Sequence, residues 1–187
     1  MNKLLIITLT CVLAGGCTSI MTAVSDDPVT ESKTSRSLGE KFDDRVLRSK
    51  ATINLSAETS LKESNIEVYS YEGQILLIGQ VPNAQLIQTA ENAVKPLRDV
   101  RSIKNLLSVG ENASFTRRTK DKLIGTKLRT KLLLNDEDSV GNIKLVVEKA
   151  EVYLYGLAEK QQVDLAISLA KETAGVKTVI TAINYVN

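Results

Sequence analysis

An internal repeat constrains this 187-residue chain more than any other feature of its sequence. Similar residues recur in one register, at an offset of 77 positions that drops by one towards the end. The matched stretches are Asp44-Arg45 with Asp121-Lys122, Asn65-Ile66 with Asn142-Ile143, Ile75–Gly79 with Val152–Gly156, and Val100–Ile103 with Val176–Val179. Agreement at four separated places indicates a duplicated structural unit. We therefore predict two copies of one small domain, joined by a short polar linker.

Each copy is predicted to follow the order helix, strand, strand, helix, strand. In the first copy, Phe42, Val46 and Ile53 fall on one stripe of a helix at about 100° per residue. Residues 65–71 alternate in the manner of a strand, and residues 75–78 are apolar on both faces, which is typical of a central strand. A second helix that ends at Pro96 and a strand over residues 100–109 complete the copy.

The fold class expected from this order is α+β, with two helices packed on a small three-stranded mixed sheet in each copy. The chain then divides into five parts. They are a signal peptide at 1–16, a lipidated N-terminus and flexible tether at 17–38, the first domain at 39–109, a linker at 110–116 and the second domain at 117–187.

The two copies differ at the turn between their first two strands. Glu72-Gly73 suits a tight turn because glycine adopts positive φ without steric cost, whereas the second copy has Ala150 in place of Gly73. Positive φ costs a residue with a Cβ atom about 1–2 kcal/mol. The second turn is therefore expected to differ in type from the first.

The N-terminus predicts export and lipid attachment. A short apolar run follows Lys3 and ends in Ala14-Gly15-Gly16-Cys17, which resembles a bacterial lipobox although its leucine lies four places before the cysteine instead of three. Cys17 is the expected lipidation site. The alternative is an ordinary signal peptide cut nearby, which would leave Cys17 as a free thiol. The absence of aspartate after the cysteine favours the outer membrane, with the protein on its periplasmic face.

The first helix of the second copy carries an excess of positive charge. Residues 117–131 hold seven basic residues and one acidic residue, whereas the matching residues 40–54 hold four and three. Ile124, Leu128 and Leu132 form an apolar stripe, and Leu123 falls outside it. A basic amphipathic helix with a spare apolar residue is typical of a membrane surface element. The predicted phospholipid-binding residues are Arg118, Lys120, Lys122, Leu123, Ile124, Lys127, Arg129 and Lys131.

Other readings of the same residues are weaker. The alternative for the basic helix is a solvated amphipathic helix whose charges aid solubility. The chain has no histidine and no tryptophan, and 4% of its residues are aromatic, which argues against a metal centre and against base stacking on nucleic acid. Asp136-Glu137-Asp138 lacks the ligand spacing of a calcium loop. We predict no catalytic residue, no metal site and no cofactor.

The repeat also resembles a known family. An apolar strand that ends in glycine (Leu77-Ile78-Gly79 and Leu154-Tyr155-Gly156), followed by a helix and a Val-Arg/Lys-Ser/Thr-Ile/Val strand, resembles the BON domain. A lipobox followed by two such units is similar to the outer-membrane lipoproteins that carry two BON domains. In those proteins a membrane-inserting tryptophan stands at the position of Leu123.

The resemblance implies a non-catalytic lipoprotein that supports outer-membrane integrity. It implies binding of anionic phospholipids, such as phosphatidylglycerol and cardiolipin, through the first helix of the second domain, and enrichment at division sites. It also implies a link to the outer-membrane β-barrel assembly machinery. The alternative role is that of a scaffold for envelope proteins, in which the basic helix or the first domain holds a protein partner.

Overall fold

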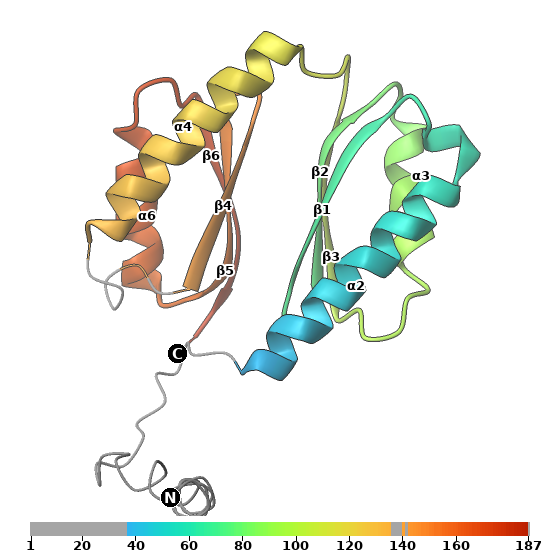
Figure 1. The fold of residues 1–187 in the computed structure, drawn as a ribbon, viewed down its shortest axis with the longest axis horizontal. Coiled ribbons are helices and arrows are strands. Elements are labelled where there is room, and N and C mark those ends of the chain that lie inside the picture. Colours follow the sequence, from blue (N-terminus) through green and yellow to red (C-terminus); the bar gives the residue numbers. More distant parts are fainter. Residues whose placement is uncertain (1–36, 136–139, 141, 187) are drawn as a thin grey trace, which may run out of the picture. The chain divides into compact units, whose positions relative to one another are not determined.

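The computed structural model describes residues 37–135, 140 and 142–186 (Figure 1). The first copy consists of helix α2 (Leu38–Ala57), a 3₁₀ turn η1 (Thr59–Leu61), strands β1 (Asn65–Tyr71) and β2 (Gln74–Val81), helix α3 (Gln85–Val94) and strand β3 (Ser102–Val109). The second consists of helix α4 (Phe115–Leu133), strands β4 (Asn142–Glu148) and β5 (Glu151–Ala158), helix α6 (Lys160–Lys171) and strand β6 (Thr178–Tyr185). The predicted signal peptide, Cys17 and the acidic run at 136–138 lie outside the described residues.

The predicted α+β fold is confirmed in both copies. Each copy holds a three-stranded sheet, in the order β1-β2-β3 and β4-β5-β6. The first two strands of each sheet are antiparallel and the last two are parallel. Corresponding strands begin 77, 77 and 76 residues apart, so the strand bounds reproduce the repeat and its one-residue gap.

The stripe predicted for the first helix is wrong. The residues of α2 that face the core are Asp44, Leu47, Ala51 and Leu55, and they pack on the sheet and on α3. Phe42 and Ile53 are each 63% exposed. The helix has apolar residues on two sides, and periodicity alone does not say which side meets the sheet. The hydrogen bonds that Asp44 accepts from the first hairpin turn place its side of α2 against the sheet.

The two hairpin turns are alike, so the predicted difference between them is also wrong. Glu72 and Gly73 have φ values of 50° and 75°, and Lys149 and Ala150 have values of 50° and 67°. Each turn therefore has two central residues at positive φ, as in a type I′ hairpin.

A buried aspartate of the preceding helix holds each turn in place. The Asp121 carboxylate accepts hydrogen bonds from the backbone N–H groups of Lys149 and Ala150, both at 2.9 Å. Asp44 accepts from the N–H groups of Glu72 and Gly73, at 2.8 and 3.0 Å. Hydrogen bonds to a buried carboxylate are strong enough to offset the cost of positive φ at Ala150.

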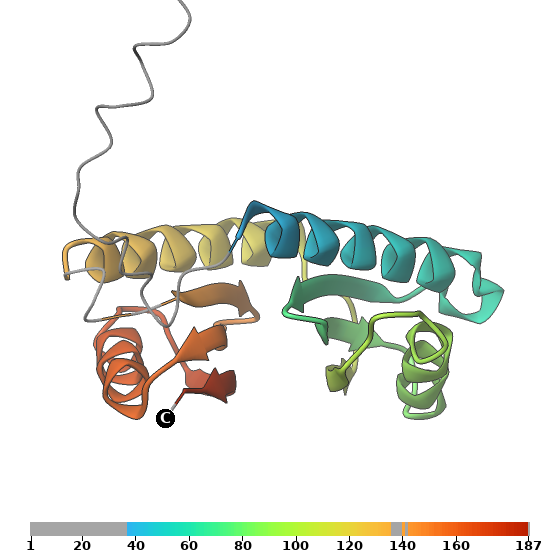
Figure 2. The ribbon, with the colours of Figure 1, turned by 90° about the horizontal axis from the view of Figure 1, so that it is seen from below.

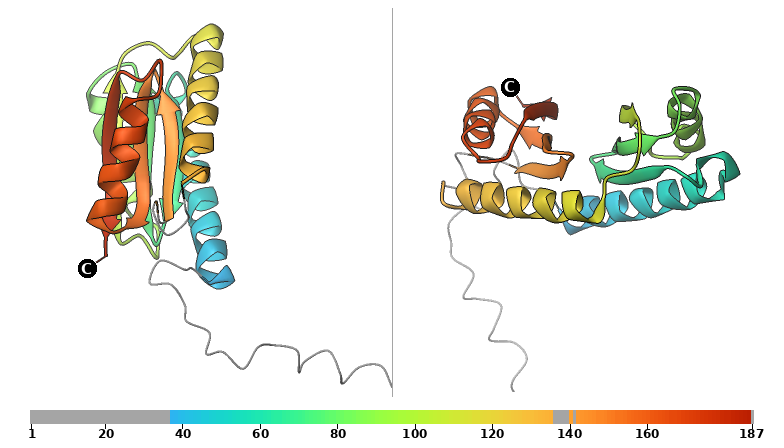
Figure 3. Two further views of the ribbon diagram at one scale, coloured as in Figure 1. Left: turned by 90° about the vertical axis from the view of Figure 1, so that its left-hand side faces the viewer. Right: turned by 90° about the horizontal axis from the view of Figure 1, so that it is seen from above.

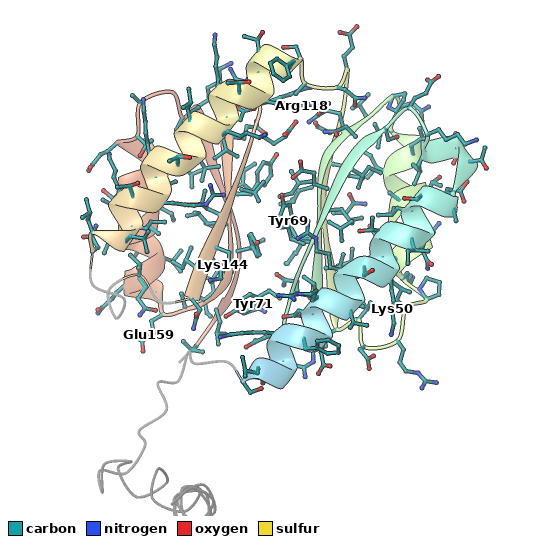
Figure 4. All side chains as sticks on the ribbon, viewed as in Figure 1. Lys50, Tyr69, Tyr71, Arg118, Lys144 and Glu159 are labelled. Atoms are coloured by element: carbon teal, nitrogen blue, oxygen red, sulfur yellow. The ribbon has the colours of Figure 1, made fainter. Side chains whose placement is uncertain are left out.

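Residues 33–187 form one compact unit, in which the two sheets face each other (Figure 1). A cluster of buried residues draws on both sheets: Leu76, Ile78, Val146, Tyr153 and Ala182. The rings of Tyr69 and Tyr155 lie beside it, with centroids 5.5 Å apart, and Figure 4 shows Tyr69 pointing from β1 towards the other sheet. This contact explains why β2 is buried along its whole length, since its two faces meet different apolar partners.

The helices therefore lie on the outer faces of the sheets. Within the compact unit, α2 and α4 run along one side, and α3 and α6 lie farther from that side (Figures 2 and 3). The linker touches both copies. Gly110 donates its N–H to the Val81 carbonyl oxygen at 3.0 Å, and Lys149 donates its Nζ to the Glu111 carbonyl oxygen at 2.6 Å.

Candidate functional site

The basic segment forms a single helix, α4, whose ends are well formed. Ser114 is the N-cap residue, and its hydroxyl oxygen accepts a hydrogen bond from the Arg117 N–H at 3.3 Å. The helix begins at Phe115, so the last residues of the predicted linker belong to it. Near its other end, Lys131 donates its Nζ to the carbonyl oxygen of Glu172, the C-cap residue of α6, at 3.1 Å. A cation at a helix C-terminus is favourable, so this contact fixes the end of α4.

One predicted lipid contact belongs to the core. Ile124 is only 7% exposed and lies on the buried side of α4, together with Leu128 and Leu132. Its side chain lies over Gly175, where an added Cβ atom would come within 3.0 Å of the Ile124 Cδ1 atom. The apolar stripe is therefore confirmed as a core stripe, and Ile124 is removed from the set of residues that can reach a lipid.

The other side of α4 presents basic residues and one large apolar residue. Leu123 is 59% exposed, and Lys120, Lys122 and Lys127 around it are exposed as well. Of the ion pairs formed between described residues, only that of Arg117 with Asp121, at 3.3 Å, involves α4. The three lysines around Leu123 thus carry their charge into solvent without a carboxylate partner among the described residues.

The remaining predicted basic residues contact backbone oxygens. The Nε atom of Arg118 donates to the Ala113 carbonyl oxygen at 3.1 Å, and the Nη2 atom of Arg129 donates to the Leu145 carbonyl oxygen at 3.4 Å. Figure 4 shows Arg118 at the beginning of α4. A carbonyl oxygen is neutral, so these contacts orient the side chains and leave their positive charge uncompensated.

Sequence reasoning missed further exposed apolar residues on the same helix. Phe115 is 85% exposed, and Leu133 and Leu134 at the opposite end are 79% and 82% exposed. The predicted linker at 110–116 includes Phe115, which the structure places in the first turn of α4. The signal was present in the spacing, because Phe115 and Leu133 are five helical turns apart and share one side of α4. Apolar side chains therefore stand at both ends of the basic surface.

The described residues include neither a membrane-spanning helix nor a metal site. In these ranges no helix is both long and apolar enough to cross a membrane. The described part of the chain also holds no group of three or more acidic or cysteine side chains placed to bind a metal ion. The basic surface of α4 is thus the feature that most needs an explanation beyond folding.

Comparisons with known proteins agree with the fold. The family model of the BON domain matches residues 43–111 and 120–187. The chain is 37% identical to a 21 kDa hemolysin of Actinobacillus pleuropneumoniae, over 81% of this chain and 78% of that protein. It is 30% identical to outer membrane lipoprotein DolP of Haemophilus influenzae, over 94% of this chain and 87% of that protein. Among solved structures, the secretion protein CdsD of Chlamydia trachomatis gives a TM-score of 0.32 at 11% identity, covering 75% and 92% of the two chains, which is too low to support an inference.

Proposed function

Since this chain belongs to the BON domain family and carries two copies of the domain, we propose that it is a non-catalytic outer-membrane lipoprotein. It binds anionic phospholipid through α4. The observation that carries the proposal is the exposure of Leu123 among Lys120, Lys122 and Lys127, which have no carboxylate partner among the described residues. The similarity to outer membrane lipoprotein DolP supports the assignment to the outer membrane.

Charge supplies most of the expected affinity. Each lysine or arginine near an anionic membrane surface contributes about 1 kcal/mol. Six basic residues of the proposed site lie on α4. Five are exposed and Lys131 is half-buried: Arg118, Lys120, Lys122, Lys127, Arg129 and Lys131. Together they contribute several kcal/mol, which falls as salt screens the charges. Insertion of the exposed part of Leu123 adds an apolar contribution of about 1 kcal/mol.

The proposed lipid anchor makes a modest affinity sufficient. Acylation of Cys17 holds the chain at the periplasmic face of the outer membrane. Twenty residues separate Cys17 from the first residue of α2, so the tether cannot span more than about 70 Å. Binding by α4 then takes place at high local lipid concentration. We propose that this contact supports outer-membrane integrity and concentrates the protein where anionic lipid is enriched, as at division sites.

Co-sedimentation with lipid vesicles tests the proposal. Residues 18–187, without acyl chains, are expected to bind vesicles that contain phosphatidylglycerol or cardiolipin and to leave phosphatidylcholine vesicles unbound. The double substitution Lys120→Glu and Lys127→Glu is expected to abolish binding. Lys95→Glu with Arg98→Glu is the matched control, since both residues are exposed outside α4 and the change in net charge is the same. Equal binding by the two variants would contradict the proposal.

A protein-interaction role is the second candidate. A groove of about 630 Å³ in the first copy favours it, between α2 and the first hairpin turn. Its lining includes the acidic residues Asp43, Glu72 and Asp99, and its apolar residues are Phe42, Val46, Leu47 and Val100. Photo-crosslinking in cells from residues of this groove tests the candidate. A crosslink to an envelope protein would support it, and crosslinks to lipid alone would count against it.

A further inference from the structure

We propose that α2, in the first copy, forms a second contact with the same anionic bilayer and inserts Phe42 and Ile53 into its interfacial region. The inference rests on the proposed function and extends it, because α4 is the lipid-binding element that the sequence indicates. The core contacts one side of α2 and leaves the opposite side exposed.

The exposed apolar residues of α2 stand opposite its core stripe. Leu47 and Ala51 point into the core. Phe42 and Ile53 are eleven residues apart, which places them within about 20° of each other around the helix and roughly opposite those core residues. Each is 63% exposed, and Leu38 on the same side is 84% exposed. Single exposed apolar residues are ordinary, but three along the outer side of one helix form an amphipathic surface that folding leaves unused.

Basic side chains flank this apolar row. Phe42 is followed by the exposed acidic residue Asp43. The basic residues of this part of α2 are Arg45, one helical turn after Phe42, and Lys41, which precedes Phe42, and both are exposed. Neither takes part in an ion pair with another described residue. An apolar row with lysine and arginine at its edge is the arrangement by which helices lie in the plane of an anionic membrane surface. The chemistry of the face therefore matches a lipid surface.

The position of α2 also favours the bilayer as its occupant. The helix begins at Leu38, directly after the segment that leads from the proposed anchor at Cys17. Within the compact unit of residues 33–187, α2 and α4 run along the same side (Figures 2 and 3). A bilayer that contacts the outer side of α4 thus meets the outer side of α2 as well. Both helices would then contribute to membrane binding, α4 mainly through its positive charge and α2 mainly through its exposed apolar side chains.

Depth-dependent fluorescence quenching in the lipidated protein tests this inference. If Cys17 is acylated and Cys11 leaves with the signal peptide, a single introduced cysteine can be labelled with bimane. Separate variants carry it at positions 42, 53 and 123, and at the exposed Gln88 of α3 as the control. The proteins are reconstituted in phosphatidylglycerol vesicles that contain brominated lipid. We expect quenching at 42, 53 and 123, and at least threefold less at 88.

Each pattern of quenching decides one question. Quenching at 123 without quenching at 42 and 53 would overturn the inference about α2 and leave the function of α4 intact. Quenching at 42 and 53 without 123 would support α2 and contradict the role of α4. Equal quenching at all four positions, or at none, would exclude an oriented contact and overturn the inference.

A binding measurement without labels provides a second test. Residues 18–187 with Phe42→Ser and Ile53→Ser are expected to bind anionic vesicles about tenfold more weakly, because two partly inserted side chains are lost. Val109→Ser with Tyr185→Ser is the matched control, since these residues are 53% and 56% exposed and lie on strands. Unchanged affinity of the α2 variant, with an unchanged circular dichroism spectrum, would overturn the inference.

Discussion

The first helices of the two copies, α2 and α4, share their inner side and differ on their outer side. The inner positions correspond at the repeat offset and are buried in both: Asp44 with Asp121, Leu47 with Ile124, Ala51 with Leu128, and Leu55 with Leu132. The outer side of α2 carries Phe42 and Ile53, whereas α4 has Thr119 and Thr130 at those positions and an excess of basic residues. The fold constrains only the inner side, so the outer side is free to acquire a function.

The largest expected effect concerns a requirement that both copies share. Gly79 and Gly156 have φ values of 135° and 125°, and an added Cβ atom would lie 1.9 Å from the Asn65 carbonyl oxygen or 2.2 Å from that of Asn142. Alanine at either position would force the antiparallel pair apart and destabilise that copy by about 4 kcal/mol. Residue-resolved hydrogen exchange should show faster exchange in the altered copy. Wild-type exchange in one of the two variants, with faster exchange in the other, would show that the two glycines are not equivalent.

The buried aspartates are expected to have the next largest effect. Asp44→Ala and Asp121→Ala should each lower the free energy of unfolding by about 3 kcal/mol, because two backbone N–H groups of the turn lose their acceptor. The loss should be greater for Asp121, since its turn holds Ala150 at positive φ while the other holds glycine. Urea unfolding measures both values. A smaller loss for Asp121→Ala would show that Ala150 does not depend on this carboxylate.

Transferring the outer features of α4 to α2 would sharpen the comparison. Asp43 and Val46 occupy the positions of Lys120 and Leu123. Asp43→Lys with Val46→Leu should raise the affinity of residues 18–187 for phosphatidylglycerol vesicles about tenfold at low salt, because the helix gains positive charge on its surface. The gain should shrink in high salt. A gain that persists at high salt would assign it to the apolar change instead.

The smallest expected effect concerns a residue pair that differs between copies. Glu148 is buried before its turn, at the position of Tyr71 in the first copy. Burial raises the pKa of the Glu148 carboxyl above 4.5, with Glu67 and Asp121 adding to the shift, while a hydrogen bond with Gln80 and the charge of Lys149 oppose it.

Because the folded state holds this proton more tightly, Glu148 favours folding at low pH, and the contribution is lost as the pH rises through the raised pKa. Glu148→Gln should therefore raise the thermal unfolding midpoint at pH 7 and leave it nearly unchanged at pH 4. Calorimetry at the two pH values tests this. A variant stabilised equally at both values would point to packing in place of ionisation.

Much of the fold could be predicted because the repeat aligns the two copies, so a helix or strand expected in one copy is expected at the matching position of the other. The alternation over residues 65–71 predicted β1 with its observed bounds, and the apolar run at 75–78 predicted the buried β2. The α4 stripe of Ile124, Leu128 and Leu132 was predicted correctly as well. The prediction that Ile124 contacts lipid was wrong, since Ile124 is buried. A residue's angular position on a helix does not say how far other elements cover its side chain.

The sequence by itself determined the duplication, the strand order and the concentration of positive charge on one helix, since periodicity, spacing and charge are local properties. The tertiary structure alone decided which side of α2 faces the core and which type of turn holds Ala150. It also decided that the other sheet covers the second face of β2. These outcomes depend on contacts between residues far apart in the chain. The hydrogen bonds from Lys149 and Ala150 to Asp121, for example, offset the cost of positive φ at Ala150, a conformation that local propensity disfavours.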